Sequence, residues 1–382
     1  MSRPAVVKAL WGAAVLVLVA GCSSKGTEDR PGTAPPTSAS ATAPGSASSS
    51  AASSAAAPSG GRVAVTGTLT EGLKSPWGLA ELPGGDLLVS SRDERTITRV
   101  DGRTGAKTSL GEVPGVVPGG EGGLMGLAVR DGWVYAYLTA ESDNRIVRMR
   151  YGGADGDRLG VPQPVLTGIP KGIVHNGGRI AFGPDGMLYA GTGETGRTGL
   201  AQDRDSLGGK ILRMTPEGKP APGNPVAGSV VYSYGHRNVQ GIAWDAEGRL
   251  WAAEFGQNTW DELNLVERGK NYGWPEVEGR AGEARFVDPV AQWPTSEASP
   301  SGIAYARGAI WMAGLRGERL WRVPLSGVER SGDPEAFLTQ EYGRLRTVLA
   351  GGGGRLWLVT SETDTRGTPG PGDDRILRLE VS

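Results

Sequence analysis

The sequence predicts an all-β fold: a six-bladed β-propeller of four-stranded antiparallel blades, with a binding site at one mouth of the central channel. One sequence pattern recurs six times, roughly 45 to 60 residues apart, which is a spacing typical of propeller blades. The composition agrees with this fold. The 63 glycines suit short strands joined by tight turns and would break helices, and the 11 Trp, a residue type favoured in strands, outnumber the 4 Phe. Nothing in the pattern requires a long helix.

The recurring unit is an apolar strand, a turn rich in Pro, Gly or Asp, a second apolar strand, and a third strand that usually contains Arg near its end. The first strands are expected at 77–80, 125–128, 179–182, 241–244, 301–304 and 346–348. The second strands are expected at 87–89, 133–135, 187–189, 250–251, 309–311 and 356–357. The third strands are expected at 97–100, 145–148, 210–213, 262–264, 319–322 and 375–378. Residues 62–65 are expected to complete the last blade and close the ring, which leaves no exposed sheet edge.

The N-terminal residues indicate export. A short basic start precedes the apolar run 9–20, which has the length of a secretory signal peptide rather than of a spanning helix. The small residues before Cys22 resemble the lipobox of bacterial lipoproteins, in which the cysteine is lipidated; a simple signal peptide with an incidental cysteine is the alternative. Cys22 is the only cysteine, so no intramolecular disulfide can form.

Three segments follow from this: a signal peptide at 1–21, a lipidated Cys22 with a tether over 22–61, and a propeller domain at 62–382. The tether is nearly all Ser, Ala, Thr, Pro and Gly, which cannot bury a core. The domain is therefore expected outside the cytoplasmic membrane, touching it only through the lipid. The net charge is −1 with acids and bases interspersed, which gives no support to a nucleic-acid-binding or polybasic membrane surface.

Only two histidines occur in the chain, and both lie in glycine-bounded polar clusters: His175 within 174–179 and His236 within 234–238. Histidine is the usual proton acceptor in catalysis because its ordinary pKa lies near neutrality. A hydrogen-bonded turn is the alternative role for each. The longest irregular stretches should carry function, because propellers bind ligands on such loops; they are 168–178, 191–209, 214–240, 254–275 and 361–374.

Several motifs spread over essentially all of 62–382 carry a family resemblance. They are HNGGR at 175–179, GHRNVQG at 235–241, DELN at 261–264 and NYGWP at 271–275. Supporting matches are PWGLA at 76–80, GEGGLMG at 120–126, AQD at 201–203, LGGK at 207–210 and GRLR at 343–346. Together they resemble the soluble quinoprotein sugar dehydrogenases, six-bladed propellers that use pyrroloquinoline quinone (PQQ).

The resemblance implies a cofactor site. PQQ is a flat ortho-quinone with three carboxylates, and arginine pairs carboxylates in a bidentate manner while staying charged. Arg237 and Asn238 would contact the cofactor, and Arg344 and Arg346 would hold its carboxylates. Arg316 falls where the family commonly has lysine, which keeps the charge but alters the donor geometry.

The resemblance also implies roles in catalysis. His175 takes the position of the base that removes the proton of the anomeric hydroxyl while hydride passes to the quinone, which converts an aldose to its lactone. Glu194 occupies the place of the carboxylate that orients this base, and His236 is better explained as loop structure that presents Arg237. Glu121 matches a position beside sugar and cofactor where the glucose enzymes carry Gln. A carboxylate at position 121 can still accept a sugar hydroxyl, but the change from Gln argues against a strict specificity for glucose. Val174 also differs, since the glucose enzymes carry an acid there.

Calcium is implied twice by the same resemblance. One Ca²⁺ would sit against the quinone oxygens and take carbonyls from Gly256 and Gln257, where the family has Gly-Pro. A second, structural ion would use Asp261, Glu262 and the carbonyl of Tyr272. Carboxylates and carbonyls are the oxygen ligands that Ca²⁺ prefers.

Other classes stay open. A calcium-dependent lactonase would need acidic and Asn ligands converging on the channel axis, and no such cluster is as clear as the arginine set. A non-enzymatic propeller that binds glycans or a partner protein would be favoured if His175 or the cofactor arginines were missing. A cofactor-free relative that kept the motifs is a third possibility. For the enzyme, the expected partners are a sugar substrate and an external electron acceptor, and the chain is expected to be a monomer.

Overall fold

The computed structural model describes residues 61–152 and 158–382. The predicted signal peptide 1–21, Cys22 and all of the predicted tether except residue 61 lie outside the described residues. Within the described ranges, no helix has the length and hydropathy needed to cross a membrane.

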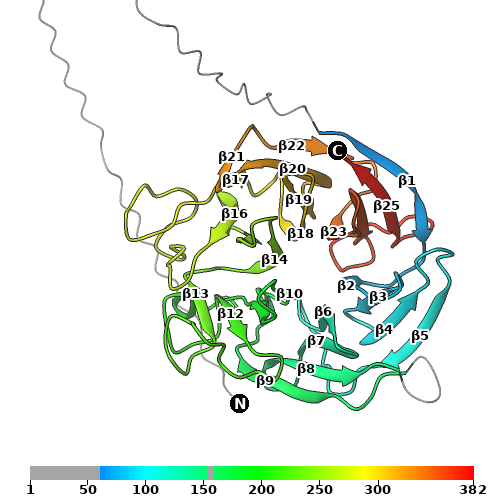
Figure 1. Cartoon of the computed structure of the whole chain (residues 1–382), viewed down its shortest axis with the longest axis horizontal. Coiled ribbons are helices and arrows are strands. Elements are labelled where there is room, and N and C mark those ends of the chain that lie inside the picture. The colour runs from blue at the N-terminus through cyan, green and yellow to red at the C-terminus, as the bar shows by residue number, and fades with distance from the viewer. Residues whose placement is uncertain (1–60, 153–157) are drawn as a thin grey trace, which may run out of the picture. The chain divides into compact units, whose positions relative to one another are not determined.

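Six antiparallel sheets form a ring, as predicted (Figure 1). Blade I holds β2 (Pro76–Glu81), β3 (Leu87–Ser91), β4 (Thr96–Val100) and β5 (Lys107–Glu112). Blade II holds β6 (Leu124–Arg130), β7 (Trp133–Thr139), β8 (Asn144–Arg150) and β9 (Gln163–Ile169). Blade III holds β10 (Ile180–Phe182), β11 (Leu188–Gly191), β12 (Lys210–Met214) and β13 (Val231–Tyr234).

Blade IV holds β14 (Val239–Trp244), β15 (Leu250–Glu254), β16 (Trp260–Val266) and β17 (Ala291–Pro294). Blade V holds β18 (Pro300–Ala306), β19 (Ala309–Gly314), β20 (Arg319–Ser326), β21 (Glu329–Arg330) and β22 (Glu335–Phe337). Blade VI holds β23 (Leu345–Ala350), β24 (Arg355–Thr360), β25 (Ile376–Val381) and β1 (Val63–Thr70). One 3-10 helix, η1 (Thr198–Ala201), lies in the loop between β11 and β12. The six-bladed, all-β prediction is confirmed.

The ring closes through blade VI. The N-terminal strand β1 pairs antiparallel with the C-terminal strand β25, with Val63 opposite Val381, and the two lie side by side in Figure 1. The two ends of the domain therefore share one sheet, as the sequence predicted for 62–65. Strands β2, β6, β10, β14, β18 and β23 are the innermost of their sheets, and each contacts the innermost strand of both neighbouring blades.

The three inner strands of each blade lie where the sequence predicts them, but it did not locate the outer strands of blades I–V. These are β5, β9, β13, β17 and β22. An outer strand has one sheet neighbour, so its side chains need not be apolar; five of the six residues of β5 are exposed. Without buried side chains there is no alternation of apolar residues from which a strand can be recognised.

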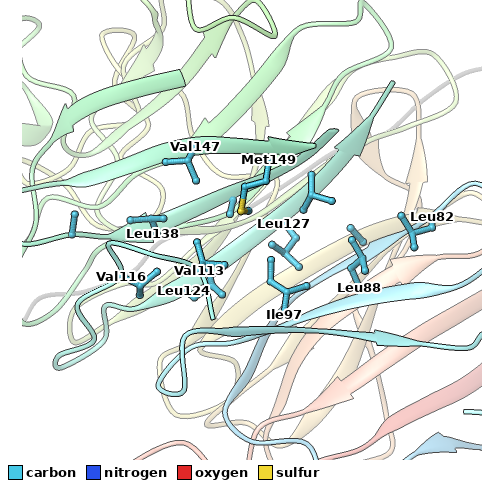
Figure 2. Packing of buried hydrophobic residues seen from close by; sticks show 14 residues of the cluster. Leu82, Leu88, Ile97, Val113, Val116, Leu124, Leu127, Leu138, Val147 and Met149 are labelled. Atoms are coloured by element: carbon cyan, nitrogen blue, oxygen red, sulfur yellow. The ribbon is translucent and has the colours of Figure 1, made fainter. Parts of the chain in front are cut away.

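The core consists of six apolar clusters, and each one fills the interface between two neighbouring blades. Figure 2 shows the cluster between blades I and II, where Leu88 and Ile97 pack against Leu124, Leu127 and side chains of β8. Trp77, Trp251 and Trp311 are among the largest fully buried side chains. Each of these three indole rings belongs to a cluster between two blades.

Truncating one of these side chains tests the packing. Leu88 is 0% exposed, so Leu88→Ala is expected to lower the free energy of unfolding by about 2–5 kcal/mol through lost burial and the cavity left behind. Val161 is 84% exposed, and Val161→Ala is expected to change that free energy by less than about 0.5 kcal/mol. Denaturant titration of both variants measures the difference; equal midpoints would contradict the packing described.

Candidate active site

A cavity of about 310 Å³ lies where loops of several blades converge. It is lined by ten of the residues predicted from the sequence: Glu121, His175, Arg237, Asn238, Gly256, Gln257, Asp261, Arg316, Arg344 and Arg346. Three more arginine and acidic side chains that the sequence did not single out line it as well: Arg92, Asp364 and Arg366. Six arginines therefore face three carboxylates, those of Glu121, Asp261 and Asp364, an excess of three positive charges.

His175 lies in the loop between β9 and β10 and adopts a left-handed backbone conformation with φ of 53°. Its backbone N–H donates to Glu121 Oε2 at 2.9 Å. Gly193 lets the end of β11 approach this loop, since a Cβ at that position would lie 1.8 Å from the His175 carbonyl oxygen. The imidazole is thus carried to the cavity wall, with its side chain 19% exposed.

The hydrogen-bond partners of the imidazole determine its tautomer. Nδ1 is hydrogen-bonded to Glu194 Oε1, and Nε2 lies 3.1 Å from Arg237 Nη2. A guanidinium can only donate, so Nε2 must accept, and Nδ1 must carry the ring proton and donate it to the carboxylate. The nitrogen that faces the cavity side therefore has a lone pair, as a general base requires.

Glu194 is held rigidly behind the histidine. The residue is 1% exposed, its backbone N–H donates to the Arg237 carbonyl at 2.9 Å, and its Oε2 is buried without a hydrogen-bond partner. The loop that follows it is tied down by Lys210, whose Nζ donates to the carbonyls of Leu200, Ala201 and Gly208 at 2.6–3.0 Å. The structure therefore brings His175 and Glu194, the two residues predicted to act in catalysis, into hydrogen-bond contact.

Arg237 bridges the base and the metal-site loop predicted at Gly256 and Gln257. Its Nη1 donates to the Phe255 carbonyl at 3.3 Å, its guanidinium lies 5.4 Å from the Trp274 ring centroid, and its Nε is buried without a partner. Burial lowers the pKa of Arg237, although nearby carboxylates oppose this shift. A buried guanidinium with an unused N–H is a donor available to an anionic ligand.

His236 has a structural role in this site. It is 0% exposed, with Nδ1 2.7 Å from Glu254 Oε1, Nε2 2.8 Å from Ser233 Oγ, and its ring stacked on Tyr272. The connectivity is that of a serine–histidine–carboxylate triad, but no substrate can reach side chains buried this deeply. Instead, Glu254 Oε2 accepts the backbone N–H of Arg237 at 2.8 Å, so the relay positions Arg237 as the sequence predicted.

Arg344 and Arg346 converge on a carboxylate that sequence reasoning missed. Their Nη2 atoms lie 3.1 and 3.0 Å from Asp364 Oδ2, and Arg346 Nη1 donates to Gln240 Oε1 at 3.0 Å. Arg344 Nε is buried without a partner. Burial alone would raise the pKa of Asp364, but the charges of Arg346 and Arg344 lower it to about 2. Asp364 lies in the irregular stretch 361–374, and this was the only signal for it.

This depressed pKa predicts an acid-sensitive contribution to stability. Because the folded-state pKa lies below the ordinary value of 3.8, Asp364 contributes about 2 kcal/mol above pH 4, and that contribution is lost as the pH falls towards 2. Asp364→Asn is therefore expected to be less stable than the native chain at pH 6 by at least this amount, with a gap that narrows below pH 4.

Unfolding free energies at pH 6, 4 and 2.5 measure this gap. Asp333, whose side chain is 99% exposed, provides the control: Asp333→Asn should show no such trend. A gap for Asp364→Asn that stays constant across the acid range would contradict the assignment.

Glu121 lines the cavity, and each of its carboxylate oxygens accepts one hydrogen bond from the protein and keeps a second lone pair. Besides accepting from the His175 backbone, its Oε1 accepts from Arg366 Nη2 at 2.7 Å, so both carboxylate oxygens are bound by protein groups. Arg366 comes from the loop after β24 and was not predicted. Arg316 is exposed and, within the described ranges, makes no hydrogen bond or ion pair, so its guanidinium is available to a ligand.

The three residues predicted to bind the second, structural calcium ion do not line one cavity. Asp261 lines the main cavity with Gly256 and Gln257, and it accepts backbone N–H groups from Gly256 at 2.9 Å and Ser299 at 2.6 Å. Burial raises the pKa of Asp261 to about 6. Glu262 and Tyr272 instead line a separate cavity of about 10 Å³.

Neighbouring residues on a strand point to opposite faces, so the side chains of Asp261 and Glu262 on β16 cannot chelate one ion together. Burial and the charge of Glu254 raise the pKa of Glu262, which disfavours its ionised form. In the part of the chain that the structure describes, no three His, Cys, Asp or Glu side chains are grouped closely enough to hold a metal ion by themselves.

Comparisons with known proteins agree with the fold and with the cavity. The family described as Glucose / Sorbosone dehydrogenase matches residues 73–369. A solved structure of the PQQ-bound form of aldose sugar dehydrogenase from Streptomyces coelicolor is 68% identical, with a TM-score of 0.84, and the match covers 86% of this chain and all of that one. A putative glucose dehydrogenase structure from Thermus thermophilus is 45% identical, with a TM-score of 0.77 over 84% of this chain and all of that one.

Among curated relatives, the aldose sugar dehydrogenase YliI of Escherichia coli K12 is 29% identical over 333 residues, which cover 77% of this chain and 89% of the relative. The family match spans well over half of the chain and includes the loops that carry His175, Arg237 and Arg344. The chain therefore belongs to the Glucose / Sorbosone dehydrogenase family and is an oxidoreductase of the sugar dehydrogenase class.

Proposed function

We propose that this protein oxidises an aldose at its anomeric carbon to the lactone, with PQQ and Ca²⁺ bound in the arginine-rich cavity and an external electron acceptor regenerating the cofactor. The observation that carries this proposal is the cavity itself, which places an imidazole lone pair beside an excess of three positive charges. Membership of the family and the PQQ-bound relative from Streptomyces coelicolor support it.

The residues present fit the cofactor. PQQ carries three carboxylates, and three is also the excess of arginines over carboxylates around the cavity. Arg344 and Arg237 each have a buried Nε–H without a partner, which an anionic ligand can accept. Arg346, Asn238 and the exposed Arg316 would add donors at the wall and rim.

The residues also fit one calcium ion. The carbonyls of Gly256 and Gln257 accept no hydrogen bond from any described residue, and Asp261 lies beside them at the same wall. Hard oxygen donors of this kind suit Ca²⁺, with the remaining ligands coming from the cofactor. Of the three ligands predicted for a second ion, Glu262 and Tyr272 line the separate cavity of about 10 Å³, and Asp261 does not.

Two residues of the chain, His175 and Glu194, accept and stabilise the proton that leaves the sugar hydroxyl. When bound, PQQ supplies an ortho-quinone that takes a hydride from the sugar carbon. His175 Nε2 takes the proton of the hydroxyl on that carbon, so the C–H and O–H bonds break and a carbonyl forms. Glu194 holds the Nδ1–H and stabilises the imidazolium that results. Arg237 is displaced from Nε2 by the substrate hydroxyl and remains beside it as a donor.

Reconstitution tests the proposal. Purified domain 62–382 is titrated with PQQ, with Ca²⁺ and with both, and turnover of an artificial acceptor dye is followed across a panel of aldoses. Tight PQQ binding and dye reduction only with both additions are expected. A folded protein that binds no PQQ would exclude a quinoprotein, and PQQ binding without turnover of any aldose would favour a non-enzymatic sugar-binding role. Lactone hydrolysis assayed in parallel without PQQ tests the lactonase alternative.

We also propose that the full chain is an extracytoplasmic lipoprotein anchored through Cys22. Support comes from the apolar run and the small residues that precede this cysteine. The native protein is expected in the membrane fraction with a lipid-modified N-terminal peptide, whereas Cys22→Ser should release it or leave it with an uncleaved N-terminus. A native N-terminal peptide that carries no lipid would contradict this, and so would a Cys22→Ser protein that is cleaved yet stays in the membrane fraction.

A further inference from the structure

Arg179 is a buried guanidinium that the proposed chemistry does not use. It precedes β10, is 7% exposed, and lies over the Trp77 ring at 4.4 Å from its centroid. Its Nε donates to the Gln240 carbonyl at 2.7 Å and its Nη2 to Thr347 Oγ1 at 3.1 Å. Both acceptors are neutral, so neither balances the charge.

The surroundings of Arg179 make the charged form of its guanidinium less favourable. Among residues 61–152 and 158–382, no carboxylate lies within 4.0 Å of this guanidinium. The charged neighbour that acts on it is Arg346, whose guanidinium lies over the same Trp77 ring at 5.8 Å and repels it. Burial, and then this repulsion, lower the pKa of Arg179 to about 9. A charge buried in this way normally has a counter-ion.

The one side of Arg179 left open faces the central channel. A cavity of about 300 Å³ there is lined by the innermost strands of all six blades, mostly by apolar side chains, together with Arg179. Among the residues that line this cavity, only Glu81 carries a carboxylate. Glu81 lies four residues from Trp77 on β2, so about 13 Å of extended strand separates the two backbone positions. Nη1 makes no hydrogen bond to any described residue and is not sealed from the cavity.

We propose that the central channel binds one small monovalent anion, of halide size, against the guanidinium of Arg179. A single uncompensated charge calls for one negative charge. Arg179 is the only cationic side chain among the residues that line this cavity, so a polyanion such as phosphate would lack a second charged partner, whereas a halide needs one.

The test uses wild-type protein without PQQ, so its outcome is independent of the proposed activity. Crystals grown with sodium bromide are expected to show an anomalous peak within hydrogen-bond reach of Arg179 Nη1. In solution, replacing sodium gluconate with sodium chloride at constant ionic strength is expected to raise Tm by about 3 °C and to saturate. No peak and no halide-specific shift, or a water in place of the ion, would overturn the proposal. So would a bromide peak without stabilisation in solution, which means an adventitious ion only.

Two variants locate the effect. Arg179→Gln should lose both the bromide peak and the chloride-dependent rise in Tm, while Arg179→Lys should keep part of the rise because the charge is retained. Arg285→Gln, at an arginine whose side chain is 59% exposed and paired with Glu276, should behave as wild type. Persistence of the full halide effect in Arg179→Gln would overturn the assignment. Should that variant not fold, the wild-type measurements decide.

Discussion

His175→Ala is expected to lower kcat for aldose oxidation by about 10²–10⁴-fold while leaving PQQ affinity within about threefold of wild type. The side chain removed carries Nε2, the ring nitrogen that accepts from Arg237 in this structure and would accept the substrate proton during turnover. The cofactor donors at Arg344, Arg346 and Arg237 stay in place. Steady-state kinetics with an artificial acceptor and PQQ titration by absorbance separate the two quantities.

The backbone at position 175 calls for a matched variant. With φ of 53°, alanine at this site is strained, whereas asparagine adopts the left-handed region more readily. His175→Asn should therefore keep the loop geometry and still lose the base, so both variants should be slow and the Asn variant should be the more stable of the two. Loss of PQQ binding in His175→Asn with the fold intact would mean that His175 holds the cofactor rather than the proton.

Glu194→Gln is expected to lower kcat by about 10²–10⁴-fold as well, because the imidazolium formed during turnover loses its counter-charge. The amide oxygen can still accept from Nδ1–H, and Arg237 still donates to Nε2, so the ring orientation is expected to survive. Glu194 is thus a positioning and charge-balancing residue. Its substitution should affect kcat far more than PQQ affinity.

Because the chain has only two histidines, nitrogen NMR can check this directly. In the native protein both rings are expected in the Nδ1–H tautomer, since each Nδ1 faces a carboxylate. His236 serves as the internal control and should not change in Glu194→Gln. A native His175 protonated on Nε2, or a fully active Glu194→Gln, would refute the proposed base.

Much of the candidate site could be predicted from the sequence, because its residues lie in compact motifs. His175, Arg237 and Arg346 are far apart along the chain, yet each was singled out by its immediate neighbours, and the structure places all three at one cavity. Their chemical roles remain predictions. The residues missed were Asp364, Arg366 and Arg92, which lie in no motif. Asp364 is recognised through its contacts with Arg344 and Arg346, Arg366 through its contact with Glu121, and Arg92 through its place on the cavity wall.

The prediction for the metal ligands shows where motif reasoning is insufficient. Asp261 and Glu262 are adjacent in sequence and were treated as one acidic pair. On β16 they point to opposite faces, one towards the main cavity and the other towards the cavity with Tyr272. Sequence adjacency within a strand separates side chains, and only the strand's place in the sheet shows which cavity each one reaches.

The sequence by itself determined the number of blades, the inner strands of each, the closure of the ring by the N-terminal strand and the loops that carry the site. These depend on local periodicity and turn chemistry, which are encoded within a few tens of residues. The tertiary structure alone decided which charges balance each other. Asp364 lies between Arg344 and Arg346, and within the described ranges no carboxylate lies beside Arg179. Such pairings require distances of a few ångströms between side chains that are well separated in the sequence, and only the folded chain sets those distances.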